Sequence, residues 1–219
     1  MSYIYFLFLG LGAGALYAVL GQGLVLAYRG SGVINLSHGA IAMYAAYTFT
    51  GLRNGQLMMP PLPNPLTITN GIAGWFGAHP DLPAIPTFIS VGGPMNVWVA
   101  LVAASVISAL LGWVLHVLVF RPLRKAPPLG KSVASVGVLL VLQAIVVLRY
   151  GTQSLSVQPF LPQHGISIAG GKVPADRFIL TGFAIVTALL LGAACRFTRW
   201  GMATRAAAQN EEGAMLIGL

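Results

Sequence analysis

Three polar side chains stand together in an otherwise apolar stretch near the N-terminus. Asn35, Ser37 and His38 lie within residues 30–39, where glycines flank them on both sides. A lipid bilayer tolerates unwound backbone only inside protein or beside a water-filled cavity. Broken helices of this kind often build substrate sites in transporters. Asn35, Ser37, His38 and Gly39 are therefore candidate residues for a polar pathway that a small solute follows.

Two other interpretations of residues 30–39 stay open. A tight cytoplasmic turn capped by Asn35 or Ser37 accounts for the same polar residues. The segment could also re-enter the membrane instead of joining two full crossings, which would change the number of spans.

A charged segment, residues 196–219, directly follows an apolar run. As a helix beginning at Met202, it places Arg205, Gln209 and Glu212 roughly on one side and offers small or apolar residues elsewhere. An amphipathic helix that lies on lipid needs a wide apolar face with bulky aromatics, and this segment has few. Its small residues would instead let another protein approach the backbone closely. The pattern therefore favours a docking surface for a protein partner.

The composition of the whole chain is too apolar for a soluble protein. Of 219 residues, 57% are hydrophobic and only 7% are charged, and the mean hydropathy is +0.81. A soluble domain has charge on about a quarter of its residues, so we expect an all-α integral membrane protein, a polytopic helical bundle. The net charge of +8 comes from short basic clusters between apolar runs. That arrangement is typical of topology signals and not of nucleic-acid binding.

Several kinds of chemistry are not expected from these residues. With one cysteine, Cys195, the chain has no internal disulfide and no cysteine-based metal cluster. No phosphate-binding loop of the G-x-x-x-x-G-K-S/T type occurs, so nucleotide hydrolysis would belong to another chain. Asp81 and Asp176 lie in predicted outer loops without catalytic partners. A membrane-embedded enzyme or a metal site is therefore not predicted.

About five spans are predicted from uncharged apolar runs, since a crossing needs about 20 residues. They cover residues 3–28, 33–52, 97–120, 132–149 and 178–195. Residues 53–96 are rich in proline and glycine, and residues 150–177 are polar, so both are expected to be outer loops. Gly10, Gly14 and Ala18 recur at four-residue spacing in the first span, with Gln22 continuing the same face, which predicts close helix packing there.

The basic residues predict the orientation. If residues 29–32, 121–131 and 196–219 are cytoplasmic, they hold most of the lysines and arginines, although the loops on the opposite side are longer. This bias agrees with the positive-inside rule and places the N-terminus outside.

Taken together, several short motifs resemble the permease subunits of bacterial ABC importers for branched-chain amino acids, the leucine/isoleucine/valine type. The resemblance extends from the first span to the C-terminus. The motifs are LYA at 16–18, GLVLAY at 23–28, GVINLSHG at 32–39, FRPLR at 120–124, TRWG at 198–201 and RAAAQN at 205–210, continuing through Gly218.

This resemblance implies a function and a set of partners. Such a subunit moves its solute into the cytoplasm by alternating access and has no cofactor of its own, while two cytoplasmic ATPase subunits use ATP and Mg. A second permease subunit or fused half and an extracytoplasmic solute-binding protein complete the importer. The subunit is a multi-pass protein of the bacterial plasma (inner) membrane.

The resemblance also gives residues 196–219 the role of a cytoplasmic coupling helix, placed after a transmembrane domain of residues 1–195. The expected ATPase-coupling residues are Arg205, Ala206, Ala207, Gln209, Asn210, Glu211, Gly213 and Gly218. The chain departs from the family pattern at Gln209 and Asn210, where acidic residues are expected, and at Met215, where a basic residue is common. Permeases of this type continue for several more helices, so C-terminal spans are expected beyond Leu219.

The substrate and one alternative class stay open. Related permeases handle urea and amides as well as leucine-type amino acids, and nothing in the spans separates these solutes. A secondary transporter or channel for a small polar solute is the alternative. Ion coupling usually uses an intramembrane acidic residue, and the predicted spans contain none, so His38 would have to serve alone.

Overall fold

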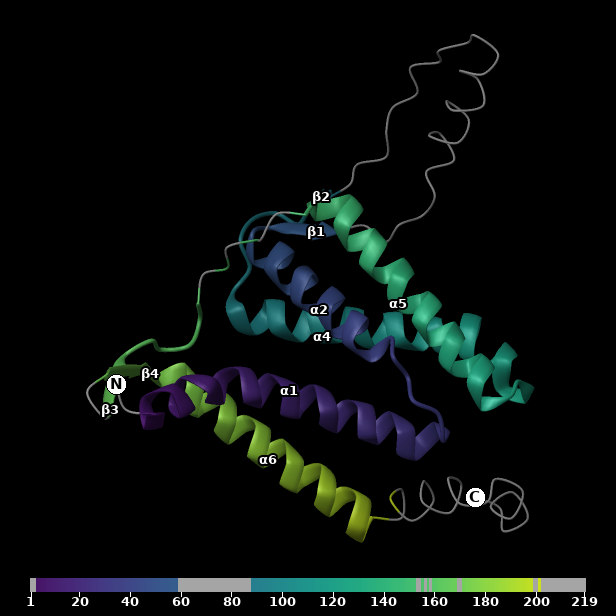
Figure 1. Ribbon diagram of the computed structural model, residues 1–219. Helices are drawn as coiled ribbons and strands as arrows, with labels where there is room; N and C mark the ends of the chain where they lie inside the picture. Colours follow the sequence, from purple (N-terminus) through teal and green to yellow (C-terminus); the bar gives the residue numbers. More distant parts are fainter. Residues whose placement is uncertain are drawn as a thin grey trace, which may run out of the picture. The chain divides into compact units, whose positions relative to one another are not determined.

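The computed structural model describes residues 3–58, 88–152, 155, 157, 159–168, 171–198 and 201, which are mostly helical (Figure 1). The chain divides into two compact units. The first comprises Met1–Gly39, Val117–Leu139 and Ser156–Leu219, and the second comprises Ala40–His116 and Leu140–Leu155. The expected all-α architecture is confirmed, with short β-hairpins added in the loops.

Two long helices dominate the first unit. Helix α1 (Tyr3–Ser31) and helix α6 (Ala175–Phe197) lie side by side (Figure 1). An antiparallel hairpin of β3 (Gly165–Ile168) and β4 (Gly171–Pro174) leads directly into α6. Because β4 contacts both helices, the hairpin holds the start of α6 against α1. This hairpin lies in the segment that the sequence predicts as the second outer loop.

Helices α1 and α6 run parallel. Near their beginnings, Phe8 pairs with Phe178, with ring centroids 5.7 Å apart. Further along both helices, the hydroxyl of Thr187 donates a 3.0 Å hydrogen bond to the side-chain oxygen of Gln22. If both helices cross the membrane in the same direction, the chain between them must cross an odd number of times. The predicted five-span topology meets this requirement.

The face of α1 that packs against α6 is not the one that the sequence predicts. Gly12 and Ala15 are buried. Gly10 and Gly14 have no atom within 4 Å of the place where a Cβ would be, and Ala18 is exposed. Positions two apart on a helix point in nearly opposite directions, because each residue turns the helix by about 100°. Small residues occur on both faces, so spacing alone does not select the packed one.

The described residues of the second unit form three helical segments and a two-stranded hairpin. Helix α2 (His38–Arg53) leads through a short turn into β1 (Gln56–Met58), which pairs antiparallel with β2 (Phe88–Ser90). Helix α4 (Val97–Leu115) follows, and its N-terminus is capped by Asn96, whose side chain accepts a hydrogen bond from the backbone of Trp98. The C-terminal part of α5 completes this unit. Strands near the two ends of the first predicted outer loop thus pair with each other, and residues 59–87 between them lie outside the described residues.

Two buried clusters stabilise the second unit. One consists of Tyr44, Met58 and Val146, and the other of Leu52, Ala100 and Ala104. The two alanines of α4 let Leu52 of α2 come close, because a small side chain allows near approach of two helices. The Tyr150 hydroxyl at the end of α5 donates a 3.3 Å hydrogen bond to the backbone oxygen of Tyr47 in α2.

Two short irregular helices lie between α4 and α5. Helix α4 continues without a break into a π-helical turn, η1 (His116–Phe120), and η2 (Pro122–Lys125) is a short 3-10 helix. Helix α5 (Pro128–Tyr150) begins at a proline, which suits the first turn of a helix because its missing N–H has no partner there in any case. It ends at Gly151, whose φ of 75° turns the chain out of the helix.

Within the described residues, four helices are long and apolar enough to cross a membrane: Tyr3–Ser31, Val97–Phe120, Pro128–Tyr150 and Ala175–Phe197. Only 6% to 22% of the most apolar window of each is buried inside the molecule. Most of their apolar surface therefore faces outward, as lipid or a partner requires. Helix α2 has 16 residues and measures about 24 Å at 1.5 Å per residue. It is shorter than the hydrocarbon core of about 30 Å.

The starts of three helices differ from the predicted ones, and α1 extends three residues beyond its predicted end, to Ser31. Helix α2 begins at His38 and not at residue 33, because the chain before it is unwound. Helix α5 begins four residues early, at Pro128, and α6 begins at Ala175 instead of residue 178. As a consequence, Asp176 and Arg177 belong to α6 and not to the outer loop. The carboxylate of Asp176 lies 3.6 Å from Nε of Arg177, an ion pair within the first turn of α6.

Packing at Ala100 gives a first test of this fold. Ala100 is fully buried beside Leu52, so we expect Ala100→Leu to overpack the contact and destabilise the protein by about 1–3 kcal/mol. The melting temperature in detergent should fall. Ala109 lies on the same helix and is exposed, so Ala109→Leu is the matched control and should leave the melting temperature unchanged. Equal melting temperatures for both variants would contradict the α2–α4 packing.

Candidate functional site

The predicted polar segment forms a short unwound connection between α1 and α2. Helix α1 ends at Ser31 because Gly32 adopts a φ of 66°, a conformation that glycine adopts without steric cost. The backbone N–H of Gly32 still donates to the Tyr28 oxygen, at 2.8 Å, and closes the last turn. The hydroxyl of Ser31 also donates to the oxygen of Ala27, at 2.8 Å.

Asn35 organises the turn that precedes α2. Its side-chain oxygen accepts hydrogen bonds from the backbone N–H of Ser37, at 3.1 Å, and from the Ser37 hydroxyl, at 2.6 Å. Its backbone oxygen accepts from the N–H of His38, at 3.3 Å. These bonds pair polar groups at the start of α2 that the helix itself leaves unsatisfied. The local geometry is therefore that of a capped turn.

A serine on α5 anchors the same turn from the outside. The hydroxyl of Ser135 accepts a 3.1 Å hydrogen bond from the backbone N–H of Leu36, and it donates one of 2.7 Å to the oxygen of Ser132. Ser135 and Ser37 are both fully buried. Because an unpaired backbone N–H would be costly in apolar surroundings, this contact fixes the unwound segment against the first half of α5.

His38 lies against α1. Its imidazole occupies the space where a side chain at Gly23 would be, with Nε2 and Cε1 as the nearest atoms. The histidine is half-buried, and only a glycine on α1 leaves room for the ring in this position. The absence of a side chain at Gly23 thus makes room for His38. Their contact joins α1 to the first residue of α2.

Burial separates the four predicted pathway residues into two groups. Asn35 and His38 are half-buried and Gly39 is exposed, whereas Ser37 is fully buried with its hydroxyl bonded to Asn35. The oxygen of Asn35 is engaged in the turn, but its side-chain NH2 group has no partner among the described residues. Asn35, His38 and Gly39 therefore keep exposed surface, whereas Ser37 supports the turn.

A second polar site, between α1 and α6, was not predicted. The side-chain nitrogen of Gln22 donates a 2.9 Å hydrogen bond to the backbone oxygen of Ala184, and its side-chain oxygen accepts from Thr187. The same hydroxyl lies 2.9 Å from the oxygen of Phe183 in its own helix, which is an alternative acceptor for its single proton. Polar residues inside apolar spans are the signal that could have indicated this contact. Their distance in sequence, 165 residues, hides the pairing.

The predicted ATPase-coupling residues, from Arg205 to Gly218, lie outside the described residues. In the part of the chain that the structure describes, no group of His, Cys, Asp and Glu side chains could hold a metal ion.

The contact between Gly23 and His38 gives a second prediction. Gly23→Ala places a methyl group where the imidazole lies, so His38 must move and the melting temperature in detergent should fall. Gly21→Ala is the control. Gly21 is on the same helix, and no described atom from another part of the chain lies within 4 Å of the place where its Cβ would be. Alanine is favoured over glycine in a helix by about 0.5–1 kcal/mol. Gly21→Ala should therefore leave the melting temperature equal or higher, and a gain for Gly23→Ala would contradict the contact.

The anchoring of Leu36 by Ser135 gives a third prediction. Ser135→Ala leaves a partly buried N–H without its partner, so we expect a loss of about 1–3 kcal/mol and faster hydrogen exchange at residues 33–37. Ser132→Ala removes an exposed hydroxyl that bonds only within its own helix and should change neither quantity. Unchanged exchange in Ser135→Ala would show that another group holds the turn.

Comparison with known proteins identifies the family. Residues 6–219 match the family described as the branched-chain amino acid transport system permease component. The high-affinity branched-chain amino acid transport system permease protein LivH of Escherichia coli K12 is 25% identical over 228 residues, and LivH of Salmonella typhimurium is 24% identical over 227 residues. Each alignment covers 100% of this chain and 64% of the relative.

A third relative gives the same result. The permease protein BraD of Pseudomonas aeruginosa is 25% identical over 216 residues, which cover 96% of this chain and 60% of BraD. The chain thus spans less than two thirds of the length of these curated relatives. No solved structure matches the chain. With its four apolar helices, the chain is a multi-pass inner-membrane protein, and it belongs to the branched-chain amino acid transport permease family.

Proposed function

We propose that this protein is the membrane permease of an ATP-driven importer that moves branched-chain amino acids into the cytoplasm by alternating access. The observation that carries the proposal is the family match, which covers residues 6–219. Urea or short amides are the alternative substrates. Two cytoplasmic ATPase subunits, a second permease subunit or fused half, and an extracytoplasmic solute-binding protein are the partners in this proposal.

The arrangement of the first unit supports a way to couple ATP use to transport. Helix α6 leads directly toward the coupling segment, residues 196–219, and α1 leads directly into the unwound residues 32–37. The two helices are parallel and are joined by the hydrogen bonds of Gln22. A displacement of the coupling segment by the ATPase would therefore move α6 and α1 together. That movement would shift Asn35 and His38, the proposed pathway residues.

The unwound segment has the chemistry that a zwitterionic or strongly polar solute needs. Asn35 offers a side-chain NH2 group, and His38 offers an imidazole that packs on Gly23. Weak and adjustable polar contacts suit a site that must both bind and release its solute.

A secondary transporter or channel is the weaker candidate. Ion coupling usually uses an acidic residue within the membrane. In the described part of the chain the one acidic residue of the apolar helices is Asp176, in the first turn of α6 and paired with Arg177. Its position at the helix end, away from residues 32–38, does not favour a role in ion coupling at the pathway.

The proposal predicts a dependence on the coupling segment. Arg205→Glu reverses a charge and Gly213→Trp adds bulk at the proposed ATPase contact, so both should weaken co-purification with candidate ATPase subunits and reduce ATP-driven leucine uptake into proteoliposomes. Lys172→Gln, a charge change on strand β4 in the hairpin, is the matched control and should preserve both.

The same experiment separates the alternatives. Uptake that persists without ATP and collapses when an ion gradient is removed would favour a secondary transporter. Unchanged association and uptake in both coupling variants would show that the ATPase contacts another part of the chain. Competition of leucine uptake by urea or short amides would assign the broader substrate class.

A further inference from the structure

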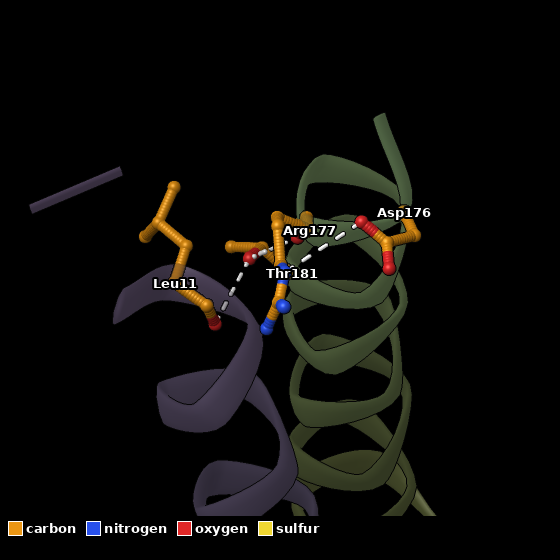
Figure 2. A network of polar contacts seen from close by, with 4 residues as sticks. All are labelled: Leu11, Asp176, Arg177 and Thr181. Carbon is orange, nitrogen blue, oxygen red and sulfur yellow. Dashed lines mark hydrogen bonds and ion pairs between the residues drawn. The ribbon is translucent and has the colours of Figure 1, made fainter. Parts of the chain in front are cut away.

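An ion pair lies at the beginning of α6, beside α1. Figure 2 shows Arg177 extending from α6 toward α1, with Asp176 on the same helical turn. Nε of Arg177 is 3.6 Å from Oδ1 of Asp176, which is longer than a hydrogen bond. Both atoms are buried and have no hydrogen-bond partner among the described residues. The two charges are therefore close to each other but not mutually satisfied.

A glycine on α1 makes room for the arginine. The side chain of Arg177 fills the place where a Cβ of Gly12 would be, with Cδ and Nη1 as its nearest atoms. The hydroxyl of Thr181 bridges the two helices beside it, donating to the oxygen of Arg177 at 2.7 Å and facing the oxygen of Leu11 at 3.5 Å (Figure 2). The guanidinium is thus held in a defined position between two helices.

Neither helix stability nor membrane topology explains Arg177. The first turn of a helix carries a partial positive charge, which favours Asp176 but disfavours an arginine. In the predicted orientation this end of α6 is on the outer side, where basic residues are depleted. Charged side chains at apolar helices are costly and usually mark a functional site. The side chain of Arg177 packs on Gly12, but this packing does not account for a positive charge in the first turn of α6.

The pair offers complementary groups to a zwitterion. A guanidinium matches a carboxylate with two parallel hydrogen bonds, and a carboxylate can accept from an ammonium group. The side chains of Arg177 and Asp176 are 36% and 20% exposed, so a small solute can reach them. Phe8 lies one helical turn from Gly12 and pairs with Phe178, which adds apolar surface next to the charges.

We propose that Arg177 and Asp176 form an outer binding site for the head group of an α-amino acid, Arg177 for the carboxylate and Asp176 for the ammonium group. The proposal rests on the proposed importer function and narrows its substrate class to zwitterionic amino acids. Urea and amides lack the carboxylate, so this site discriminates against them.

The test measures ligand binding apart from the solute-binding protein. The permease, assembled with its second permease subunit and ATPase subunits in nanodiscs, is titrated with radiolabelled leucine, and leucinamide, 4-methylpentanoate and urea are used as competitors. The first competitor lacks the carboxylate and the second lacks the ammonium group. We expect each to compete at least about tenfold more weakly than leucine, since each loses one charge-assisted contact. Urea should compete least.

Variants locate the site. Arg177→Gln and Asp176→Asn should each weaken leucine binding about tenfold or more, Arg177→Lys should retain part of it, and Gly12→Ala should weaken it by displacing the guanidinium. Lys172→Gln, another cation near the start of α6, is the control and should bind leucine as the wild type does. The melting temperature of each variant shows whether it is folded.

The outcomes separate this proposal from the importer function. Leucinamide competing as well as leucine, or unchanged leucine affinity in a folded Arg177→Gln complex, would overturn the site while ATP-driven uptake by the wild type still supported the importer. Absence of ATP-driven uptake of any solute by the wild-type complex would instead overturn the proposed function.

Discussion

The requirement that every polar backbone group has a partner in apolar surroundings shapes the unwound segment of this molecule and the helices beside it. The chain breaks its helical structure at residues 32–37, and each exposed backbone group there needs a substitute partner. Asn35 supplies one from within the turn, and Ser135 supplies another from α5. The same requirement makes Gln22 bond to the backbone of α6. The polar contacts of the first unit are therefore concentrated where helices end or meet.

These contacts join the two long helices of the first unit. Helices α1 and α6 are parallel. Gln22 and Thr187 join them by a hydrogen bond, and near their beginnings the side chain of Arg177 packs on Gly12. Helix α1 leads into the unwound residues 32–37, and α6 leads into residues 196–219, the proposed coupling segment. The pair would thus connect ATPase docking to the pathway. Its opposite end carries the charges proposed to receive the substrate, so binding and coupling would act on the same two helices.

Two glycines of α1 make these contacts possible, because they have no side chain and leave space for a side chain from another element. Gly23 admits the imidazole of His38, and Gly12 admits the guanidinium of Arg177. At Gly10 and Gly14, in the same helix, no described atom from another part of the chain lies within 4 Å of the place where a Cβ would be. A glycine-rich span therefore has two kinds of small residue, those that accommodate a side chain from another element and those on a face that the described residues do not cover.

The sequence alone determined the membrane class, the number of long apolar helices to within one, the basic clusters and the polar break, because composition and hydrophobic runs are local properties. It also carried the family resemblance, which the comparisons confirmed. It did not determine which face of α1 packs, since small residues occur on both. It missed Gln22 with Thr187 and Asp176 with Arg177 as sites, because the first pairing joins distant segments and the second depends on where α6 begins. Only the tertiary structure decides such contacts, since they depend on how helices far apart in sequence approach each other.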